Sequence, residues 1–439
     1  MRAPILLVLS ISLWGLMAAS CASGLSSGSD TDEELYDFLT DGDGPAGEDV
    51  ISDGDEPASE GEAPLPDGDL AETADDADSE LVDDTDTNDA PPSDGDADGD
   101  APPDGDEDIL PDGDAEEREL PDWLADARCG MTPPEGVKLA APPPPYGGGQ
   151  CPELAAGFNT LTSSGKARRF MLVLPADPQP DERYPLLFMW HWLKSKPESF
   201  YDHGEVQDAV DQQCFIAVIP ASLYDINLFG LLELPWPFVN FVSQARIDEE
   251  LRFFDDMLAC ISERFAIDKE CVSTVGVSAG ALWSVQLATA RSQYIASLIS
   301  LSGGTGVQGL SSNFVRFWSP PARKFPTLVL WGGPLDSCIL LNFQDCSQEL
   351  ERDLIEGGHF FLECVHNCKH GEPPIDPPPG LSRYHTLWDF MFRHPYWLPE
   401  GLSPYNATGL PSDYIPWCGV GMGSAVPRVG ECPPPSCPI

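Results

Sequence analysis

The stretch Cys271–Trp283 constrains the fold more than any other part of the chain. It begins with a β-branched run, continues into Gly-Val-Ser-Ala-Gly at 276–280, and ends where a helical pattern starts. A strand, a sharp turn and a helix in this order expose the residue at the turn, here Ser278, beside the helix N-terminus. Gly276 and Gly280 fit this interpretation, because a strand and a helix that cross closely leave no room for a Cβ. We therefore predict that Ser278 is a nucleophile.

Acidic residues are concentrated towards the N-terminus. The first 128 residues hold 40 of the 73 acidic residues and three of the 23 basic ones, so 37 of the 50 net negative charges lie there. This part is rich in Asp, Gly, Pro, Ala and Ser, and it has too little apolar surface to form a core. We predict a disordered acidic tether over 21–128, an α/β domain over 129–397 and a Cys/Pro-rich extension over 398–439. The negative charge argues against nucleic acid as a partner.

The first twenty residues have the pattern of an export signal. Arg2 is followed by an apolar run from Ile5 to Met17, which is too short to span a bilayer. The small residues that follow end at Cys21 and resemble the bacterial lipoprotein box. We predict a lipoprotein-type signal peptide over 1–20, lipidation of Cys21, and anchoring in the outer membrane or at the cell surface. The alternative is an ordinary secretory signal and a periplasmic or secreted protein.

Thirteen cysteines indicate an oxidising compartment. Cys21 stands apart, and the other twelve could form six disulfides. The sequence has no C-x-x-C pair, and the closest pair is Cys364 and Cys368, so a zinc site is the weaker interpretation and we predict no metal. Cys129 and Cys151 flank a Pro/Gly-rich turn, which suggests a disulfide between them.

Apolar runs alternate with helical patterns through the body of the chain. Continuous apolar runs are typical of strands buried on both faces of a parallel sheet. Apolar residues spaced by three and four give one face of a helix over 248–264. With G-x-S-x-G between a strand and a helix, this order predicts the α/β-hydrolase fold, a mostly parallel central sheet flanked by helices. The predicted strands are 169–175, 186–190, 215–220, 271–277, 298–304, 327–333 and 359–364, and the other predicted helices are 281–291 and 386–393.

In this fold an acid and then a histidine follow the nucleophile along the chain. Asp336 comes after a predicted strand and two glycines, where its carboxylate would orient and stabilise an imidazole. Asp345 is the alternative acid. We expect His370 to be the base, because it lies on the loop after the last predicted strand and precedes a glycine and a Pro-rich exit. His366, on the same loop, is the alternative base.

An acyl-transfer site also needs N–H groups where negative charge develops on the substrate oxygen. We expect these from Ala279, the residue after the nucleophile, and from Trp192, in the loop that follows strand 186–190. Trp192, Trp236 and Trp283 could also line a site for an acyl or aromatic group. The alternative for these tryptophans is a place in the core. This chemistry calls for no cofactor.

Several motifs together resemble secreted esterases. They are Tyr184–His191, Ser199-Phe200, Asp255-Asp256, Gly276–Gly280, Trp331-Gly332-Gly333-x-x-Asp336 and His370-Gly371. Over roughly residues 155–397 the chain is similar to polyhydroxybutyrate depolymerase-like and feruloyl or acetylxylan esterase-like α/β-hydrolases. The resemblance implies hydrolysis of a small or polymeric carboxylic ester through an acyl-enzyme on Ser278, and we expect a monomer.

Two other functions stay open. The resembled family usually has His-Gly-Cys-Gly-Gly where this chain has His191-Trp192-Leu193-Lys194, and that difference favours a non-catalytic surface lipoprotein that kept the hydrolase scaffold. A serine peptidase of the same fold is the second alternative. It is weakened because no propeller-like repeat accompanies the hydrolase-like part of the sequence.

Overall fold

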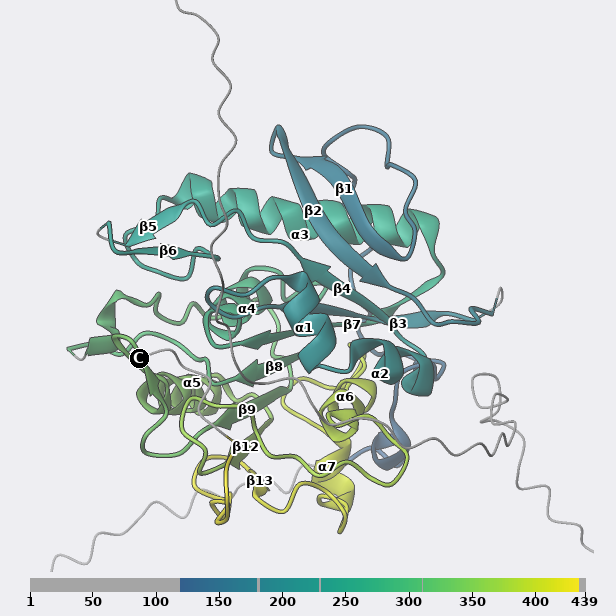
Figure 1. Cartoon of the computed structure of the whole chain (residues 1–439). Coiled ribbons are helices and arrows are strands. Elements are labelled where there is room, and N and C mark those ends of the chain that lie inside the picture. The colour runs from purple at the N-terminus through teal and green to yellow at the C-terminus, as the bar shows by residue number, and fades with distance from the viewer. Residues whose placement is uncertain (1–118, 180–181, 229, 310, 434–439) are drawn as a thin grey trace, which may run out of the picture. The chain divides into compact units, whose positions relative to one another are not determined.

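A computed structural model describes residues 119–179, 182–228, 230–309 and 311–433 (Figure 1). The predicted signal peptide, Cys21 and the predicted tether up to residue 118 lie outside this part. Residues 119–128 were assigned to the tether, and that boundary is wrong. The short helix η1, Leu124–Asp126, buries Leu124 completely in a cluster with Trp397 and Leu402. No described helix combines the length and the apolar character that a membrane span requires.

Nine strands of the described residues form one sheet. They are β1 Gly157–Ser163, β2 Lys166–Val173, β3 Tyr184–Trp190, β4 Ile216–Pro220, β7 Ile267–Val277, β8 Ser297–Leu301, β9 Thr327–Trp331, β12 Phe361–Val365 and β13 Cys418–Val420. Their order is β1-β2-β4-β3-β7-β8-β9-β12-β13, and the central strands from β4 to β12 are parallel to one another. Antiparallel strands complete both edges. The predicted mostly parallel sheet is confirmed.

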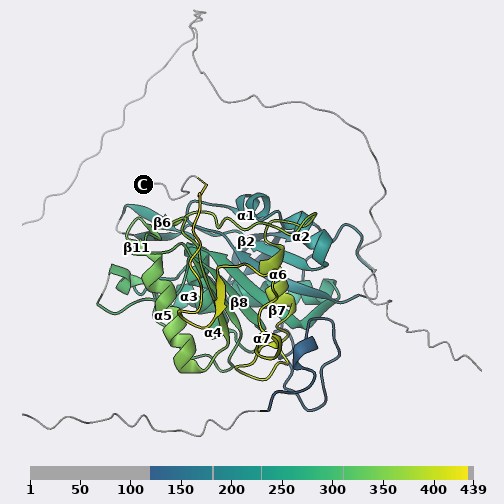
Figure 2. The same ribbon diagram turned by 90° about the horizontal axis from the view of Figure 1, so that it is seen from below.

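Helices cover both faces of this sheet (Figures 1 and 2). They are α1 Pro197–His203, α2 Val206–Gln213, α3 Gln244–Arg264, α4 Ala279–Ala290, α5 Phe343–Gly357, α6 His385–Phe392 and α7 Pro404–Thr408. Strand β3 shows why its sequence is apolar throughout. Phe188 and Trp190 pack with residues of α3, α4 and α5, whereas Leu187 and Met189 pack with residues of α1, α2 and α6. Both faces of the strand are therefore core.

Two small antiparallel hairpins stand apart from the sheet, and the sequence did not indicate either. One joins β5, Ile226–Leu228, to β6, Leu232–Leu234, and the other joins β10, Ser337–Cys338, to β11, Leu341–Asn342. A second short helix, η2, Ser311–Phe314, precedes β9 in the chain. These strands are only two or three residues long, too short for an alternating pattern to stand out.

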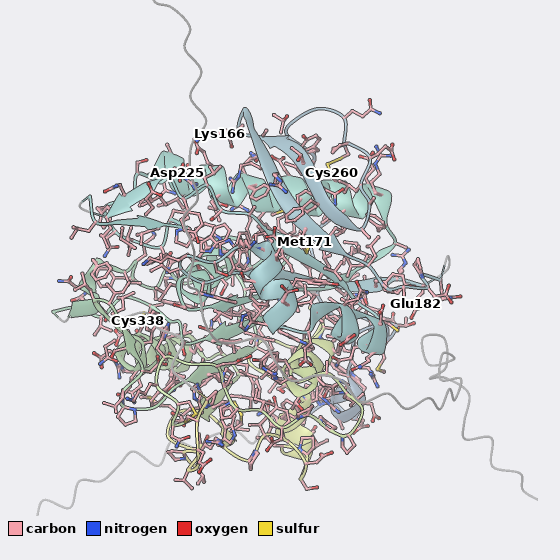
Figure 3. The ribbon with its side chains drawn as sticks, viewed as in Figure 1. Lys166, Met171, Glu182, Asp225, Cys260 and Cys338 are labelled. Carbon is pink, nitrogen blue, oxygen red and sulfur yellow. A yellow bond between two sulfur atoms is a disulfide. The ribbon has the colours of Figure 1, made fainter. Side chains whose placement is uncertain are left out.

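Four disulfides have both of their cysteines in the described part of the chain, and they overturn the one pairing that was predicted. Cys129 is bonded to Cys271 at β7, and Cys151 is bonded to Cys260 on α3, which is labelled in Figure 3. The other two are Cys364–Cys418 and Cys368–Cys432. Cys346 is a buried free thiol, so the twelve cysteines after Cys21 do not all pair. Disulfides of this kind are typical of proteins that fold in an oxidising compartment.

Helix α5 places a carboxyl group in the core, and this makes stability depend on pH. Glu351 is fully buried and accepts a hydrogen bond from Trp331 Nε1 at 3.2 Å. Burial, with the nearby Glu363 adding to it, raises the pKa of Glu351 from 4.5 to about 8. Between these two pKa values the folded chain keeps a proton on Glu351 that the unfolded chain releases. The contribution of Glu351 to stability is therefore largest at low pH and is lost as the pH rises towards 8.

We expect the Tm of Glu351→Gln, taken relative to the wild type at the same pH, to rise by several degrees between pH 5 and pH 9, because the other titrating groups affect both proteins alike. Circular dichroism melting curves at the two pH values measure it. Glu356→Gln, on the exposed side of the same helix, is the control and should behave as the wild type. The same change of Tm with pH in all three proteins would contradict the role of Glu351.

Candidate active site

Ser278 stands at a strained turn between β7 and α4. Its φ of 55° and ψ of −119° are unusual for a residue with a side chain. Backbones approach so closely here that a Cβ on Gly276 would overlap the Gly280 carbonyl, and a Cβ on Gly280 would overlap the Trp190 carbonyl. The two glycines thus allow β7, α4 and the end of β3 to meet, and the serine hydroxyl is presented at that meeting point.

Ser278, His370 and Asp336 form one hydrogen-bonded series. His370 Nε2 lies 2.9 Å from Ser278 Oγ, and His370 Nδ1 lies 2.7 Å from Asp336 Oδ1. Asp336 is fully buried, and its Oδ2 accepts hydrogen bonds from Ser302 Oγ at 2.8 Å and from the Gly332 N–H at 2.7 Å. This arrangement suits a histidine that donates from Nδ1 to the carboxylate and accepts the serine proton at Nε2.

The loops that carry Asp336 and His370 touch through their backbones. The Lys369 N–H donates to the Gly332 carbonyl at 3.1 Å, and a Cβ on Gly332 would overlap the Lys369 carbonyl. The His370 ring also stacks on Phe343, with centroids 4.1 Å apart and an angle of 20° between the planes. Contacts on both the backbone and the ring therefore fix the imidazole against the acid.

The alternative acid and base have other places. His366 is fully buried, and its Nδ1 accepts the Cys368 N–H at 3.1 Å. Burial lowers the pKa of His366 to about 4, so the ring is neutral and braces its own loop. Asp345 lies in the first turn of α5, where its N–H donates to the Asn342 side chain. The geometry thus groups His370 and Asp336 with the serine.

Ala279 and Trp192 are the two residues from which the oxyanion N–H groups are expected. Ala279 is the first residue of α4, and helix starts leave backbone N–H groups without intrahelical partners. Trp192 follows β3 directly after His191. The buried His191 ring donates from Nδ1 to the Trp192 carbonyl at 3.0 Å, and burial lowers its pKa to about 4. Trp236 Nε1 donates to the His191 carbonyl at 2.8 Å. These two bonds hold the backbone around Trp192 without the expected glycines.

A cavity of about 360 Å³ opens beside Ser278 and His370. Its walls are mainly apolar and include Trp192, Phe200 and Trp388. A smaller cavity of about 50 Å³ lies on the Ala279 side of the serine. Cys338, labelled in Figure 3, lines both cavities from strand β10. The serine therefore faces a large apolar chamber and a small one.

The structure separates the three tryptophans. Trp192 lines the large cavity, so its predicted contact with substrate stays open. Trp236 and Trp283 are fully buried and line neither cavity, so the prediction that they contact substrate is wrong. They pack around Trp190, with ring centroids 5.0 Å and 6.0 Å from it. Sequence alone did not distinguish them, because tryptophan serves equally in cores and in binding sites.

The sequence analysis missed several residues that shape the site. Ser302, which holds the acid, follows the end of β8 and precedes two glycines, and polar residues at the carboxyl ends of parallel strands are a recognisable signal. Trp388 reaches the cavity from α6, and Tyr384 reaches it from the position directly before that helix. Nothing in their local pattern distinguishes them from core residues of that helix.

Part of the chain is similar in sequence to a known protein, and its fold is similar to that of solved structures. No family model matches the chain. Feruloyl esterase D from Neurospora crassa is 27% identical over 169 residues, which are 38% of this chain and 56% of that protein. The chain thus spans about half the length of this relative. Native sOPH superposes with a TM-score of 0.50 at 17% identity, over 64% of this chain and 99% of that one. Native pOPH superposes with a TM-score of 0.50 at 16% identity, over 62% and 97%.

The chain has the α/β-hydrolase fold. The similarity to solved structures shows the fold. The sequence match to part of a feruloyl esterase confirms the resemblance that the motifs indicated.

Proposed function

We propose that this protein is a serine esterase that hydrolyses carboxylic esters with Ser278, His370 and Asp336. The observation that carries the proposal is the hydrogen-bonded series of these three side chains beside an apolar cavity. The similarity to a protein named feruloyl esterase D supports an ester as the substrate.

The geometry suits a two-step reaction. His370 Nε2 takes the Ser278 proton as Oγ attacks the ester carbonyl, and the same proton then passes to the leaving alcohol. Water, activated by His370, next attacks the acyl-enzyme and releases the acid. Asp336 keeps the imidazole in the required tautomer and stabilises its cation. The Ala279 and Trp192 N–H groups bind the oxyanion in both steps.

The large cavity favours an ester with a bulky apolar or aromatic group. Trp192, Phe200, Tyr384 and Trp388 supply flat or broad apolar surface beside the serine. Burying a ring or an alkyl group against such apolar walls is energetically favourable. They offer few partners for the backbone amides of an extended peptide, which makes the peptidase alternative weaker.

We further propose that the enzyme is exported and held at a membrane by its N-terminus. The four disulfides agree with export. Lipidation of Cys21 and an acidic tether remain predictions from the sequence. Mass spectrometry of the mature N-terminus tests the lipidation, because a diacylglyceryl group on the Cys21 sulfur identifies the lipoprotein. An unmodified Cys21, or a mature N-terminus at another residue, contradicts it.

The proposed function is tested by incubating the full chain with a fluorophosphonate probe and, separately, with p-nitrophenyl acetate and butyrate. We expect one probe molecule per chain and release of p-nitrophenol from both esters. A folded chain that neither binds the probe nor hydrolyses either ester would establish the alternative, a non-catalytic protein with a hydrolase scaffold.

Trp236 should affect catalysis although it does not touch the substrate. Trp236→Phe keeps an aromatic ring but removes the donor to the His191 carbonyl, at a cost of about 1 kcal/mol in unfolding free energy. We expect kcat for p-nitrophenyl acetate to fall several-fold, because the Trp192 N–H is less firmly placed. Trp283→Phe is the matched control. Trp283 is equally buried, but its Nε1 has no hydrogen-bond partner among the described residues. Equal kcat values in the two variants would contradict this role.

A further inference from the structure

The loop that carries His370 is bonded to the C-terminal part of the chain. Cys368 precedes His370 by two residues and forms a disulfide with Cys432. The neighbouring Asn367 uses its whole side-chain amide for the same contact. Its Nδ2 donates to the Gly430 carbonyl at 2.8 Å, and its Oδ1 accepts from Arg428 Nη1 at 2.8 Å.

The same C-terminal segment is also bonded to strand β12, which leads into this loop. Strand β13 pairs antiparallel with β12, and the Cys364–Cys418 disulfide joins two residues that lie opposite each other. Beyond the ladder, the Val365 N–H donates to the Trp417 carbonyl at 3.0 Å, and the Arg428 N–H donates to the Val365 carbonyl at 2.9 Å. We call residues 417–432 the C-terminal clamp.

On its other side the histidine loop rests against the acid loop. The His366 N–H donates to the Trp331 carbonyl at 3.0 Å, and the Lys369 N–H donates to the Gly332 carbonyl. Lys369, immediately before His370, has a φ of 57°, a conformation that a residue with a side chain keeps only when its surroundings impose it. The clamp and the acid loop together impose it.

We propose that the C-terminal clamp is a positioning element for His370, acting through the Cys368–Cys432 disulfide and Asn367. The inference rests on the proposed function, since it assigns a role in the same reaction. His370 has to meet Ser278 at 2.9 Å and Asp336 at 2.7 Å at once. A misplacement of about 1 Å in such a group costs about 10²-fold in rate. Only Lys369 lies between Cys368 and His370. The disulfide therefore restricts the position of the His370 backbone directly.

A disulfide that only stabilises the fold would act mainly by restricting the unfolded chain. The Cys151–Cys260 bridge provides the matched control, because it spans 109 residues against 64 for Cys368–Cys432 and lies away from the histidine loop. Since the entropic contribution grows only with the logarithm of that span, removing either bridge should lower stability by a similar amount. Their effects on the rate of catalysis should differ.

The experiment compares the full-length wild type with C368S/C432S and with C151S/C260S, well below the Tm of each protein. For C368S/C432S we expect kcat for p-nitrophenyl acetate to fall about 10- to 100-fold with KM changed less than about twofold. Fluorophosphonate labelling should become slower by a similar factor but still reach one probe per chain. For C151S/C260S both kinetic constants and the labelling rate should stay within about twofold of the wild type.

Each other outcome has a definite meaning. If C368S/C432S labels at the wild-type rate but to a lower final level, a fraction has misfolded and the positioning role is rejected. Equal kcat values in the two double variants also reject it. If the wild type itself neither labels nor hydrolyses, it is the proposed function that fails.

Should C368S/C432S not fold, Asn367→Ala keeps the disulfide and decides the matter. We expect its labelling rate to fall several-fold. Asn159→Ala is its control, because that amide also uses both its oxygen and its nitrogen, with Ala155 and Gly157 beside the edge strand β1, and it lines neither cavity. A wild-type labelling rate in Asn367→Ala would then overturn the proposal.

Discussion

Ser278→Ala is expected to lower kcat for p-nitrophenyl acetate by four to six orders of magnitude, about the loss that follows removal of a serine nucleophile. The reason is geometric. His370 Nε2 lies 2.9 Å from Ser278 Oγ. The neighbours of Ser278 in this turn, Val277 and Ala279, carry no hydroxyl group that could replace it. Fluorophosphonate labelling should vanish at the same time. Stopped assays with high enzyme concentration measure the residual rate.

Ser284→Ala provides the control for this experiment. Ser284 lies on the same helix, α4, but its hydroxyl donates to the Ala281 carbonyl inside the fold and does not line either cavity. The variant should label fully and keep its kcat. If Ser278→Ala retained labelling while its melting curve matched the wild type, the nucleophile would have to be another residue.

The central strands could be predicted because burial on both faces leaves few polar positions in them. Strand β3 is buried at every residue, and the sequence showed it as an unbroken apolar run. The position of Ser278 could also be predicted, because Gly276 and Gly280 mark the point where the backbones of β7, α4 and the end of β3 approach one another. Helix α5 was missed although Phe343, Cys346, Leu350 and Leu354 are spaced by three and four, which is a helical signal.

Other features depend on contacts that local pattern does not contain. Cys129 was assigned to Cys151 because the two flank one turn, yet each bonds a cysteine more than a hundred residues away. The extension after residue 397 was separated from the hydrolase part on composition alone. In the structure it supplies strand β13 to the same sheet and holds the histidine loop. Pairing of distant segments is decided by the folded core, and a single sequence does not record it.

Asp336→Asn is expected to lower kcat by about three to four orders of magnitude while leaving the fold intact. The hydrogen bonds of the carboxylate explain why. Oδ2 accepts from Ser302 and from the Gly332 N–H, so in the variant the amide oxygen should take that position. The amide NH₂ then faces His370 Nδ1 and turns it into an acceptor. The ring proton moves to Nε2, which faces Ser278 and can no longer accept its proton.

Asp345→Asn tests whether this effect belongs to the site or to any acid after β9. Asp345 was the alternative acid from the sequence, and it lies in the first turn of α5. We expect its kcat within about twofold of the wild type. Circular dichroism should show similar melting for both variants, because neither changes side-chain volume. If Asp336→Asn kept more than a tenth of the wild-type kcat, the carboxylate would not be setting the histidine tautomer, and Asp336 would have a structural role only.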